Sequence, residues 1–262
     1  MAKRGRAGRE ASKAKRGTGG IRLYGRHAVE AALDNPNRTA RKLFVTSEIA
    51  QKYHLPTDLP VERGDGAALA RMVPGDAPHQ GLVLEVDALP VVHLDQLLGG
   101  RKPLLVLDQV TDPHNVGAII RSAAAFGAAG IITQDRHSPP ESGALAKAAS
   151  GALERMPWCR VTNLARALEE IAEAGYWRVG LAGEAERTLS ESTRDMPTCL
   201  VLGAEGDGLR QNVAAHCDVL ARLPISDAVE SLNVSNAAAV ALYAVTNATD
   251  TSHPAAAPNK MT

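Results

Sequence analysis

The feature that most constrains the fold is a regular alternation of short apolar runs and helical stretches that begins at Pro103. Strand-like runs lie at 104–107, 130–133, 160–161, 178–181, 199–202 and 219–223, and helical patterns at 113–126, 142–152, 164–174, near 211 and at 233–247. Such alternation is typical of parallel strands with helices on both faces. The sequence therefore predicts an α/β domain with a parallel sheet over residues 103–248.

A smaller αβ unit is expected before it, over residues 21–88. Helical spacing at 24–33 stops at the breaker 34–37, and two strands, 42–46 and 81–86, flank a helical piece at 67–72. Residues 89–102 contain Pro90 and two adjacent glycines, which predicts a linker with one short helix.

The two ends of the chain differ from the rest in composition. Residues 1–20 carry seven Lys or Arg and one Glu, so the remainder has a net charge of −6. We expect 1–20 to be a disordered basic tail that is directed to RNA, with a merely solubilising extension as the alternative. Residues 249–262, small and polar, are expected to form a flexible tail.

Composition excludes several classes of protein. The chain is 45% apolar and 22% charged, as in ordinary soluble proteins, and no apolar run approaches the length of a membrane span. We therefore expect neither export nor a membrane partner. Its three cysteines are scattered, which argues against disulfides and zinc and fits a reducing cytoplasm. No histidine spacing indicates a metal site. With eight aromatic residues, a stacking platform for nucleic acid is not expected.

Two small-residue loops follow late strands. Residues 203–208 contain three glycines directly after the strand at 199–202, and 223–233 precede the last helix. The usual dinucleotide fold places its glycine loop after the first strand, so a nucleotide-like ligand would here be bound by late loops. The structural alternatives are that Glu205 is a solvated loop acid and that Ser231 or Asn233 only caps the last helix.

The helix at 113–126 is well specified. Asp112 can cap it and Pro113 suits its first turn. Arg121 shares a side with Gly117 and with Ala124 or Ala125, which leaves room for a ligand or another backbone. The alternative is an ordinary surface arginine. The last helix is almost wholly small or apolar at 237–243, so it must be buried against the sheet or another subunit.

Three blocks, in this order, resemble the motifs of the SPOUT-superfamily RNA ribose 2′-O-methyltransferases. They are 107–123 with Asp112-Pro113-His114-Asn115 and Arg121, then 202–206, then 223–235 with Ser231-Leu232-Asn233. Residues 24–29 and 79–81 resemble the L30e-like substrate-binding domain found in bacterial 23S rRNA guanosine-2′-O-methyltransferases. The likeness covers about residues 21–247. Ile225, Asp227 and Asn236 depart from the usual pattern, which affects the expected shape of the pocket.

The resemblance implies a C-terminal trefoil knot, a rare exception to unknotted topology, and S-adenosyl-L-methionine as cofactor. It implies backbone contacts to that cofactor from Gly203, Leu223 and Leu232. The implied catalytic cluster comprises Asn115, Arg121, Glu205, Ser231 and Asn233. It also implies a homodimer with the active site near the subunit boundary.

The activity implied is methylation of a guanosine ribose in the peptidyl-tRNA-binding loop of 23S rRNA, on naked RNA or a ribosome precursor; no DNA partner is expected. Alternatives are a tRNA ribose methyltransferase and a non-catalytic RNA-binding assembly factor. Because guanidinium scarcely loses its proton, our hypothesis is that Arg121 holds the substrate phosphate and stabilises alkoxide charge. A phosphate oxygen, water or Glu205 would then take the proton.

Overall fold

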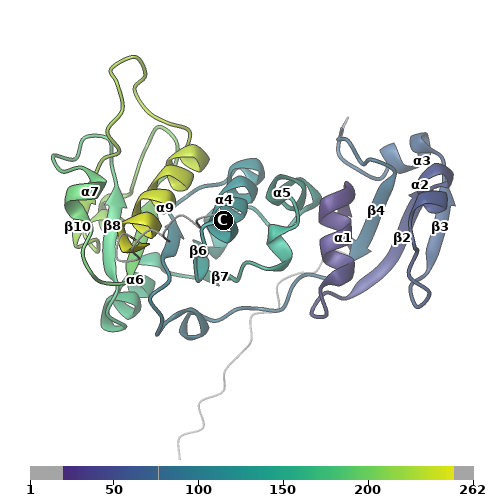
Figure 1. Ribbon diagram of the computed structural model, residues 1–262, viewed down its shortest axis with the longest axis horizontal. Coiled ribbons are helices and arrows are strands. Elements are labelled where there is room, and N and C mark those ends of the chain that lie inside the picture. The colour runs from purple at the N-terminus through teal and green to yellow at the C-terminus, as the bar shows by residue number, and fades with distance from the viewer. Residues whose placement is uncertain (1–19, 76, 251–262) are drawn as a thin grey trace, which may run out of the picture.

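The computed structural model describes residues 20–75 and 77–250, which contain two sheets set along the long axis of the molecule (Figure 1). Residues 1–19 of the predicted basic tail lie outside the described residues. So do residues 251–262 of the predicted C-terminal tail. Thr249 and Asp250 belong to the last helix, which begins one residue later and ends three residues later than the sequence predicts.

The larger sheet has six strands, and every neighbouring pair is parallel, as the sequence predicts. Its order is β10-β8-β9-β5-β6-β7. The strands are β5 (Leu104–Leu107), β6 (Gly130–Gln134), β7 (Trp158–Val161), β8 (Trp177–Leu181), β9 (Thr198–Leu202) and β10 (Val219–Ala221). The prediction for the last strand was two residues too long, because Arg222 leaves the sheet and pairs with residues 187–189 instead.

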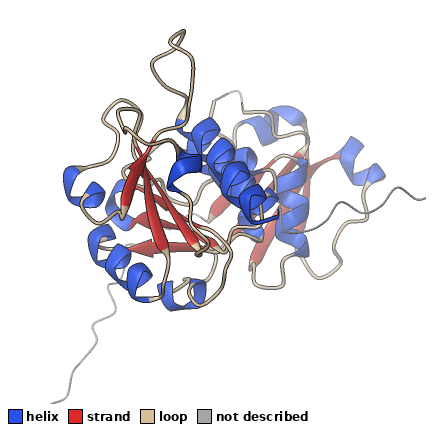
Figure 2. Ribbon diagram, turned by 60° about the vertical axis from the view of Figure 1, so that its left-hand side comes forward, coloured by secondary structure: helices blue, strands red, loops and turns tan. Residues whose placement is uncertain are grey.

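Helices cover both faces of this sheet (Figure 2), because successive residues of a strand point to opposite sides. Leu105 and Leu107 pack with α4, α5, α7 and α9, whereas Leu104 and Val106 pack with α6 and α8. The helices are α4 (Pro113–Ala125), α5 (Gly143–Ala149), α6 (Leu164–Glu173), α7 (Leu189–Ser192), α8 (Gln211–Ala214) and α9 (Val234–Asp250). Short 3-10 turns lie at Leu94–Leu97, Asp135–His137 and Ala152–Glu154.

The smaller sheet is mixed, with the order β1-β4-β2-β3; β4 is antiparallel to both neighbours and β2 is parallel to β3. The elements are β1 (Ile21–Tyr24), α1 (Arg26–Asp34), β2 (Ala40–Thr46), α2 (Ser47–Lys52), β3 (Val61–Gly64), α3 (Gly66–Ala70) and β4 (Leu82–Val86). The sequence prediction missed β1, α2 and β3. The sequence pattern predicted a helix from Tyr24, but Tyr24 is the last residue of β1 and pairs with Val83 of β4.

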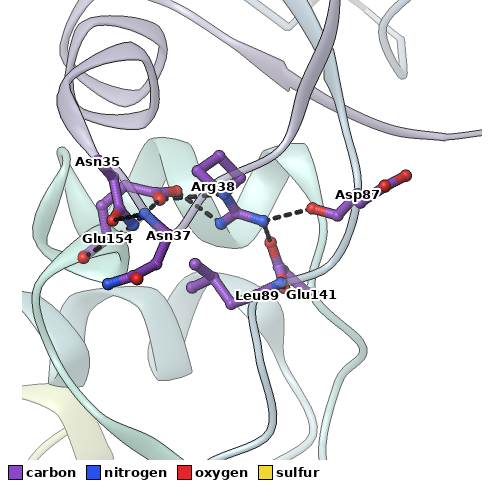
Figure 3. A network of polar contacts seen from close by, with 7 residues as sticks. All are labelled: Asn35, Asn37, Arg38, Asp87, Leu89, Glu141 and Glu154. Atoms are coloured by element: carbon purple, nitrogen blue, oxygen red, sulfur yellow. Dashed lines mark hydrogen bonds and ion pairs between the residues drawn. The ribbon is translucent and has the colours of Figure 1, made fainter.

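The two units pack directly on each other through α5, β1 and α1. A Cβ on Gly143 would overlap the main chain of Arg22 and the ring of Tyr24, so only glycine allows α5 to begin this close to β1. Beside this contact the wholly buried side chain of Arg38 binds two carboxylates of the larger unit, Glu141 and Glu154 (Figure 3). The two units are therefore joined by polar as well as apolar contacts.

Strand order alone does not establish how the chain is threaded, so the trefoil knot stays a prediction. Within residues 20–75 and 77–250, no helix has the length and apolar character needed to cross a membrane.

Candidate active site

The candidate site lies at the carboxyl edge of the parallel sheet, where the segments after β5 and β9 meet the start of α9. Parallel strands place their carboxyl ends at one edge, and this is where ligands of open α/β sheets bind. Segments that are about ninety residues apart in the chain, or more, are thus brought together.

Helix α4 enters the site through a fixed first turn. The side chain of Asp112 accepts a hydrogen bond from the His114 backbone N–H at 2.9 Å, and Pro113 occupies the first turn, both as predicted. A Cβ on Gly117 would lie 2.7 Å from the Ala148 Cβ and would overlap the Leu145 carbonyl, so α4 lies directly against α5. These contacts hold Asn115, which stands between them, in position.

The loop after β9 folds back tightly on itself. Gly208 N–H donates to the Ala204 carbonyl at 3.1 Å, and a Cβ on Gly203 would overlap the Gly208 main chain. The glycine at 203 is therefore required by the loop itself. The loop presents Glu205, which is exposed, at its tip.

An ion pair between a buried carboxylate and a partly exposed arginine anchors the far end of this loop. Asp108, fully buried at the end of β5, accepts hydrogen bonds from the Arg210 backbone N–H at 3.0 Å and from Arg210 Nε at 2.8 Å. Arg210 also donates to Gln134 Oε1 at 2.9 Å. The sequence analysis did not single out Asp108 and Arg210 for this role. The available signal was a carboxylate directly after an entirely apolar strand, which needs a partner when buried.

Asn233 joins the three segments. Its Oδ1 accepts from the Ser235 backbone N–H at 2.9 Å, which caps α9, while its Nδ2 donates to Asn115 Oδ1 at 3.0 Å and to Glu205 Oε1 at 2.5 Å. Asn115 Nδ2 completes the triangle at 3.2 Å from Glu205 Oε1. Asn233 therefore caps α9 and also contacts the two other predicted site residues. We call Asn115, Glu205 and Asn233 the amide–carboxylate triad.

Two predicted members of the cluster lie apart from the triad within one chain. Arg121 is exposed and has no hydrogen bond or ion pair with any residue that the structure describes. Ser231 is exposed in the segment 224–231, which leaves the domain as a long loop in Figure 1. Asn233, not Ser231, caps α9.

The three residues expected to contact a cofactor lie in segments at the same edge of the sheet. Gly203 follows β9, Leu223 follows β10, and the half-buried Leu232 precedes α9. Strand β8 lies between β9 and β10, so the ends of β9 and β10, which the loops at 203 and 223 continue, are about 10 Å apart. Ligands of open α/β sheets bind beyond the carboxyl ends of the strands, so these residues are positioned to contact a nucleoside cofactor.

A metal centre is not indicated. In the part of the chain that the structure describes, no group of three or more His, Cys, Asp or Glu is placed to hold a metal ion. All three cysteines are free, and burial raises the pKa of Cys159 to about 11.

Comparison with known proteins defines the class. The SpoU rRNA methylase family model matches residues 102–243, and the RNA 2′-O ribose methyltransferase substrate-binding model matches 22–92. The chain belongs to the SpoU rRNA methylase family. The resemblance found from the motifs is thereby confirmed.

Individual relatives are similar over nearly the whole chain. The 23S rRNA (guanosine-2′-O-)-methyltransferase RlmB of Pseudomonas aeruginosa is 40% identical over 86% of this chain and 95% of its own length. An uncharacterised tRNA/rRNA methyltransferase of Synechocystis is 36% identical over 85% of this chain, which spans 61% of that longer protein. The SpoU methyltransferase AviRb of Streptomyces viridochromogenes shares the fold, with a TM-score of 0.76, 22% identity and coverage of 89% and 91% of the two chains.

Proposed function

We propose that this protein transfers a methyl group from S-adenosyl-L-methionine to the ribose 2′-oxygen of a guanosine in 23S rRNA. The observation that carries the proposal is the amide–carboxylate triad, in a chain that is 40% identical to a 23S rRNA guanosine methyltransferase over 95% of that protein. The match of the substrate-binding model supports an RNA substrate. We place the target in the peptidyl-tRNA-binding loop, on naked RNA or a ribosome precursor in the cytoplasm.

The fold supports the proposed cofactor as well, because an rRNA methyltransferase of Sinorhizobium meliloti solved with AdoMet bound matches this chain with a TM-score of 0.73, at 23% identity over 88% of each chain. Gly203, Leu223 and Leu232 would hold it through their main chains. When bound, the cofactor supplies an electrophilic methyl group on a sulfonium.

The triad's own part in the reaction is to position polar groups around the ribose. Glu205 Oε1 receives three donors, from Asn115 Nδ2, Asn233 Nδ2 and the Val234 backbone N–H at 3.3 Å. That fixes the carboxylate and leaves Oε2 to accept a hydrogen bond from the ribose hydroxyl. Alignment of the hydroxyl with the donor is the main contribution we assign to these residues.

Arg121 completes the site from a second copy of the chain. It lies six residues after Asn115 on α4, about 9 Å along the helix axis and about 120° around it, so it does not face its own triad. On the adjacent α9, two large side chains are exposed: Val240 at 47% and Tyr243 at 59%. A homodimer that covers these side chains brings Arg121 towards the partner's triad, where it would hold a substrate phosphate.

Mixed dimers test this arrangement. Arg121→Ala and Asn233→Ala should each lose activity, and subunits of the two variants, unfolded and refolded together, should regain about a quarter of wild-type turnover, since half of the dimers then hold one intact site. No recovery, in a mixture that contains heterodimers, contradicts a shared site. Arg121→Lys keeps the charge without the planar fork, and near-normal turnover would contradict a role for guanidinium geometry.

The substrate is tested by mapping ribose methylation in rRNA and tRNA from a strain that lacks the gene. We expect one large-subunit guanosine to lose its methyl group. Loss confined to tRNA would support the tRNA alternative instead. Titration calorimetry with S-adenosyl-L-methionine separates both from a non-catalytic assembly factor, which has no reason to bind that molecule.

A further inference from the structure

The smaller unit carries a cavity of its own, away from the triad. It has a volume of about 490 Å³ and is lined by Arg26, Ile49, Lys52, Tyr53 and Gln80. It lies where β2 ends and β4 begins, because Thr46 N–H bonds to the Gly81 carbonyl at 3.0 Å. The volume falls in the range of small-molecule sites, about 300–1,000 Å³. We call these five residues the Tyr53 pocket.

One wall of the Tyr53 pocket is aromatic and cationic. The guanidinium carbon of Arg26 lies 5.3 Å from the centre of the Tyr53 ring, and Arg26 Nε is held by Glu30 at 2.9 Å. Lys52 adds a second cation, which pairs on the surface with Glu48 at 2.6 Å. Surface pairs of this kind are weak and exchange readily for another anion. The wall therefore offers a flat ring together with two cations that can turn to a phosphate.

The opposite side is an amide with a fixed orientation. Gln80 Oε1 accepts from the Arg26 backbone N–H at 3.0 Å and from Lys147 Nζ at 3.1 Å. Lys147 comes from α5 of the methyltransferase unit and also donates to the Pro78 carbonyl at 2.9 Å. With its oxygen engaged twice, and with no partner for Nε2 among the described residues, the amide has its N–H groups available to a ligand.

We infer that the Tyr53 pocket binds one unpaired nucleotide of the RNA substrate, with its base stacked on Tyr53 and its phosphate against Arg26 and Lys52. This inference rests on the proposed RNA methyltransferase function. Gln80 Nε2 donates to an acceptor on the base edge, and Ile49 supplies the apolar floor. Proteins that recognise single-stranded RNA commonly combine a stacked aromatic ring, a cation and an amide in this way.

The chemistry of the pocket selects this ligand over a double helix. A buried base face on Tyr53 requires an unstacked base, which a duplex does not offer. A second cavity of about 420 Å³ between the two units, by contrast, includes the carboxylates Glu30 and Asp34 in its lining and no Phe, Tyr or Trp. The sequence analysis expects no stacking platform for nucleic acid, and this inference adds a single stacking residue.

The link through Lys147 gives the pocket a role in placing the target. Lys147 packs against Gly25, and a Cβ there would overlap its ammonium, so this contact is tight. Figure 1 shows α2 near the far end of the molecule from α9, whose first residue follows Asn233 of the triad, and α1 between α2 and α5. A nucleotide held in the pocket therefore fixes a flanking part of the RNA at a set distance from the reacting ribose.

The experiment measures RNA binding and turnover for pocket variants of the full chain, with a synthetic large-subunit rRNA fragment that the wild type methylates. Tyr53→Ala should weaken RNA binding by about 5- to 100-fold, the range for loss of one base–aromatic stack. Tyr53→Phe should bind as the wild type does. In kinetics, KM for RNA should rise while kcat at saturating RNA and affinity for S-adenosyl-L-methionine stay unchanged.

A matched control separates the pocket from general charge effects. Arg26 and Arg41 belong to the same unit, are 60% and 59% exposed, and each pairs with one carboxylate. Arg41 stands near the opposite end of β2, about 17 Å from Thr46. Arg26→Ala should weaken RNA binding at least fivefold more than Arg41→Ala. Equal effects of these two changes would overturn the inference.

A crosslinking experiment on the wild type tests the inference even if the Tyr53 variants misfold. Ultraviolet crosslinking of the wild type to 4-thiouridine-substituted RNA, followed by mass spectrometry, should place a crosslink on the peptide that contains Tyr53. Absence of any crosslink at residues 49–53 or 80, in a protein that methylates the same RNA, would overturn the inference. A wild type that methylates no rRNA would count against the proposed function instead, so the two failures are distinguishable.

Discussion

The side-chain Nδ2 of Asn233 lies 3.0 Å from the side-chain Oδ1 of Asn115, although the two are 118 positions apart in the chain. The same Asn233 caps α9 through its Oδ1. One residue thus sets where the last helix begins and ties it to the first helix of the parallel-sheet unit. Because the amide has separate donor and acceptor atoms, its two roles can be separated by choosing the substitution.

Asn233→Ser should keep the helix cap and lose the triad. Serine caps a helix about as well as asparagine, but its hydroxyl is too short to reach both Asn115 and Glu205. We expect turnover to fall by about 100-fold, the loss seen when one oriented polar group is removed from an active site. The free energy of unfolding should change by less than about 0.5 kcal/mol. Single-turnover methylation and urea denaturation measure the two effects.

Asn233→Ala is the comparison variant for that pair of roles. It loses the triad and the cap together, so it should match the serine variant in turnover and be less stable by about 1 kcal/mol. If Asn233→Ser retains wild-type turnover, the triad has no part in the reaction and Asn233 serves α9 alone.

Arg210→Ala tests whether the buried Asp108 positions the loop that carries Glu205. The substitution leaves Asp108 with the 210 backbone N–H as a donor but without the guanidinium. An incompletely paired buried carboxylate costs about 1–3 kcal/mol, and we expect a loss within that range. Turnover should fall while RNA affinity stays unchanged. Arg101→Ala is the control, since its pair with Asp195 is exposed and should contribute less than about 1 kcal/mol.

The larger unit was predictable from sequence because its central strands, β5 and β9, are buried along their whole length and parallel strands need covering on both faces. The caps at Asp112 and Asn233 were also predictable, because a helix start depends on residues that are adjacent in the chain. The smaller sheet was harder: β3 reads Val-Glu-Arg-Gly, with two exposed charges at an edge, and carries little apolar pattern. Local patterns cannot predict such a strand, which is held by its pairing with β2.

The site shows the same limit at the level of single residues. The motifs brought Asn115, Glu205 and Asn233 into one hypothesis, and the structure places them within hydrogen-bonding distance. Arg121 was predicted to join the same cluster, but within one chain it is exposed and lies apart from the triad. Asp108 was overlooked because its partner, Arg210, lies 102 residues away.

Arg38→Ala should separate the two units. The Arg38 side chain is wholly buried and donates to Glu141, to the Asp87 carbonyl at 2.7 Å and to Glu154 Oε1 at 2.6 Å (Figure 3). Removing it leaves two carboxylates facing each other with little solvent, so we expect a loss of about 3–5 kcal/mol. Trypsin should then cut within residues 88–102 faster than in the wild type, since those residues join the two units.

Arg41→Ala controls for the loss of one arginine in the same unit, because its pair with Asp87 is exposed. It should change stability by less than about 1 kcal/mol and leave proteolysis as it was. A stable Arg38→Ala protein with an unchanged cutting rate would show that apolar contacts between α5 and β1 suffice to hold the units together.

Stability should fall as the solution becomes alkaline, because two cysteine thiols are buried in the sheet. Burial raises the pKa of Cys159 to about 11 and raises that of Cys199 as well, from ordinary values near 9. Between those values the unfolded chain loses thiol protons that the folded chain keeps, so the folded state binds more protons and stability decreases with rising pH. Each thiol contributes a slope of up to about 1.4 kcal/mol per pH unit above pH 9. Urea denaturation at pH 8, 9 and 10 measures this slope, which Cys159→Ala should reduce; an equal slope in that variant would contradict the assignment.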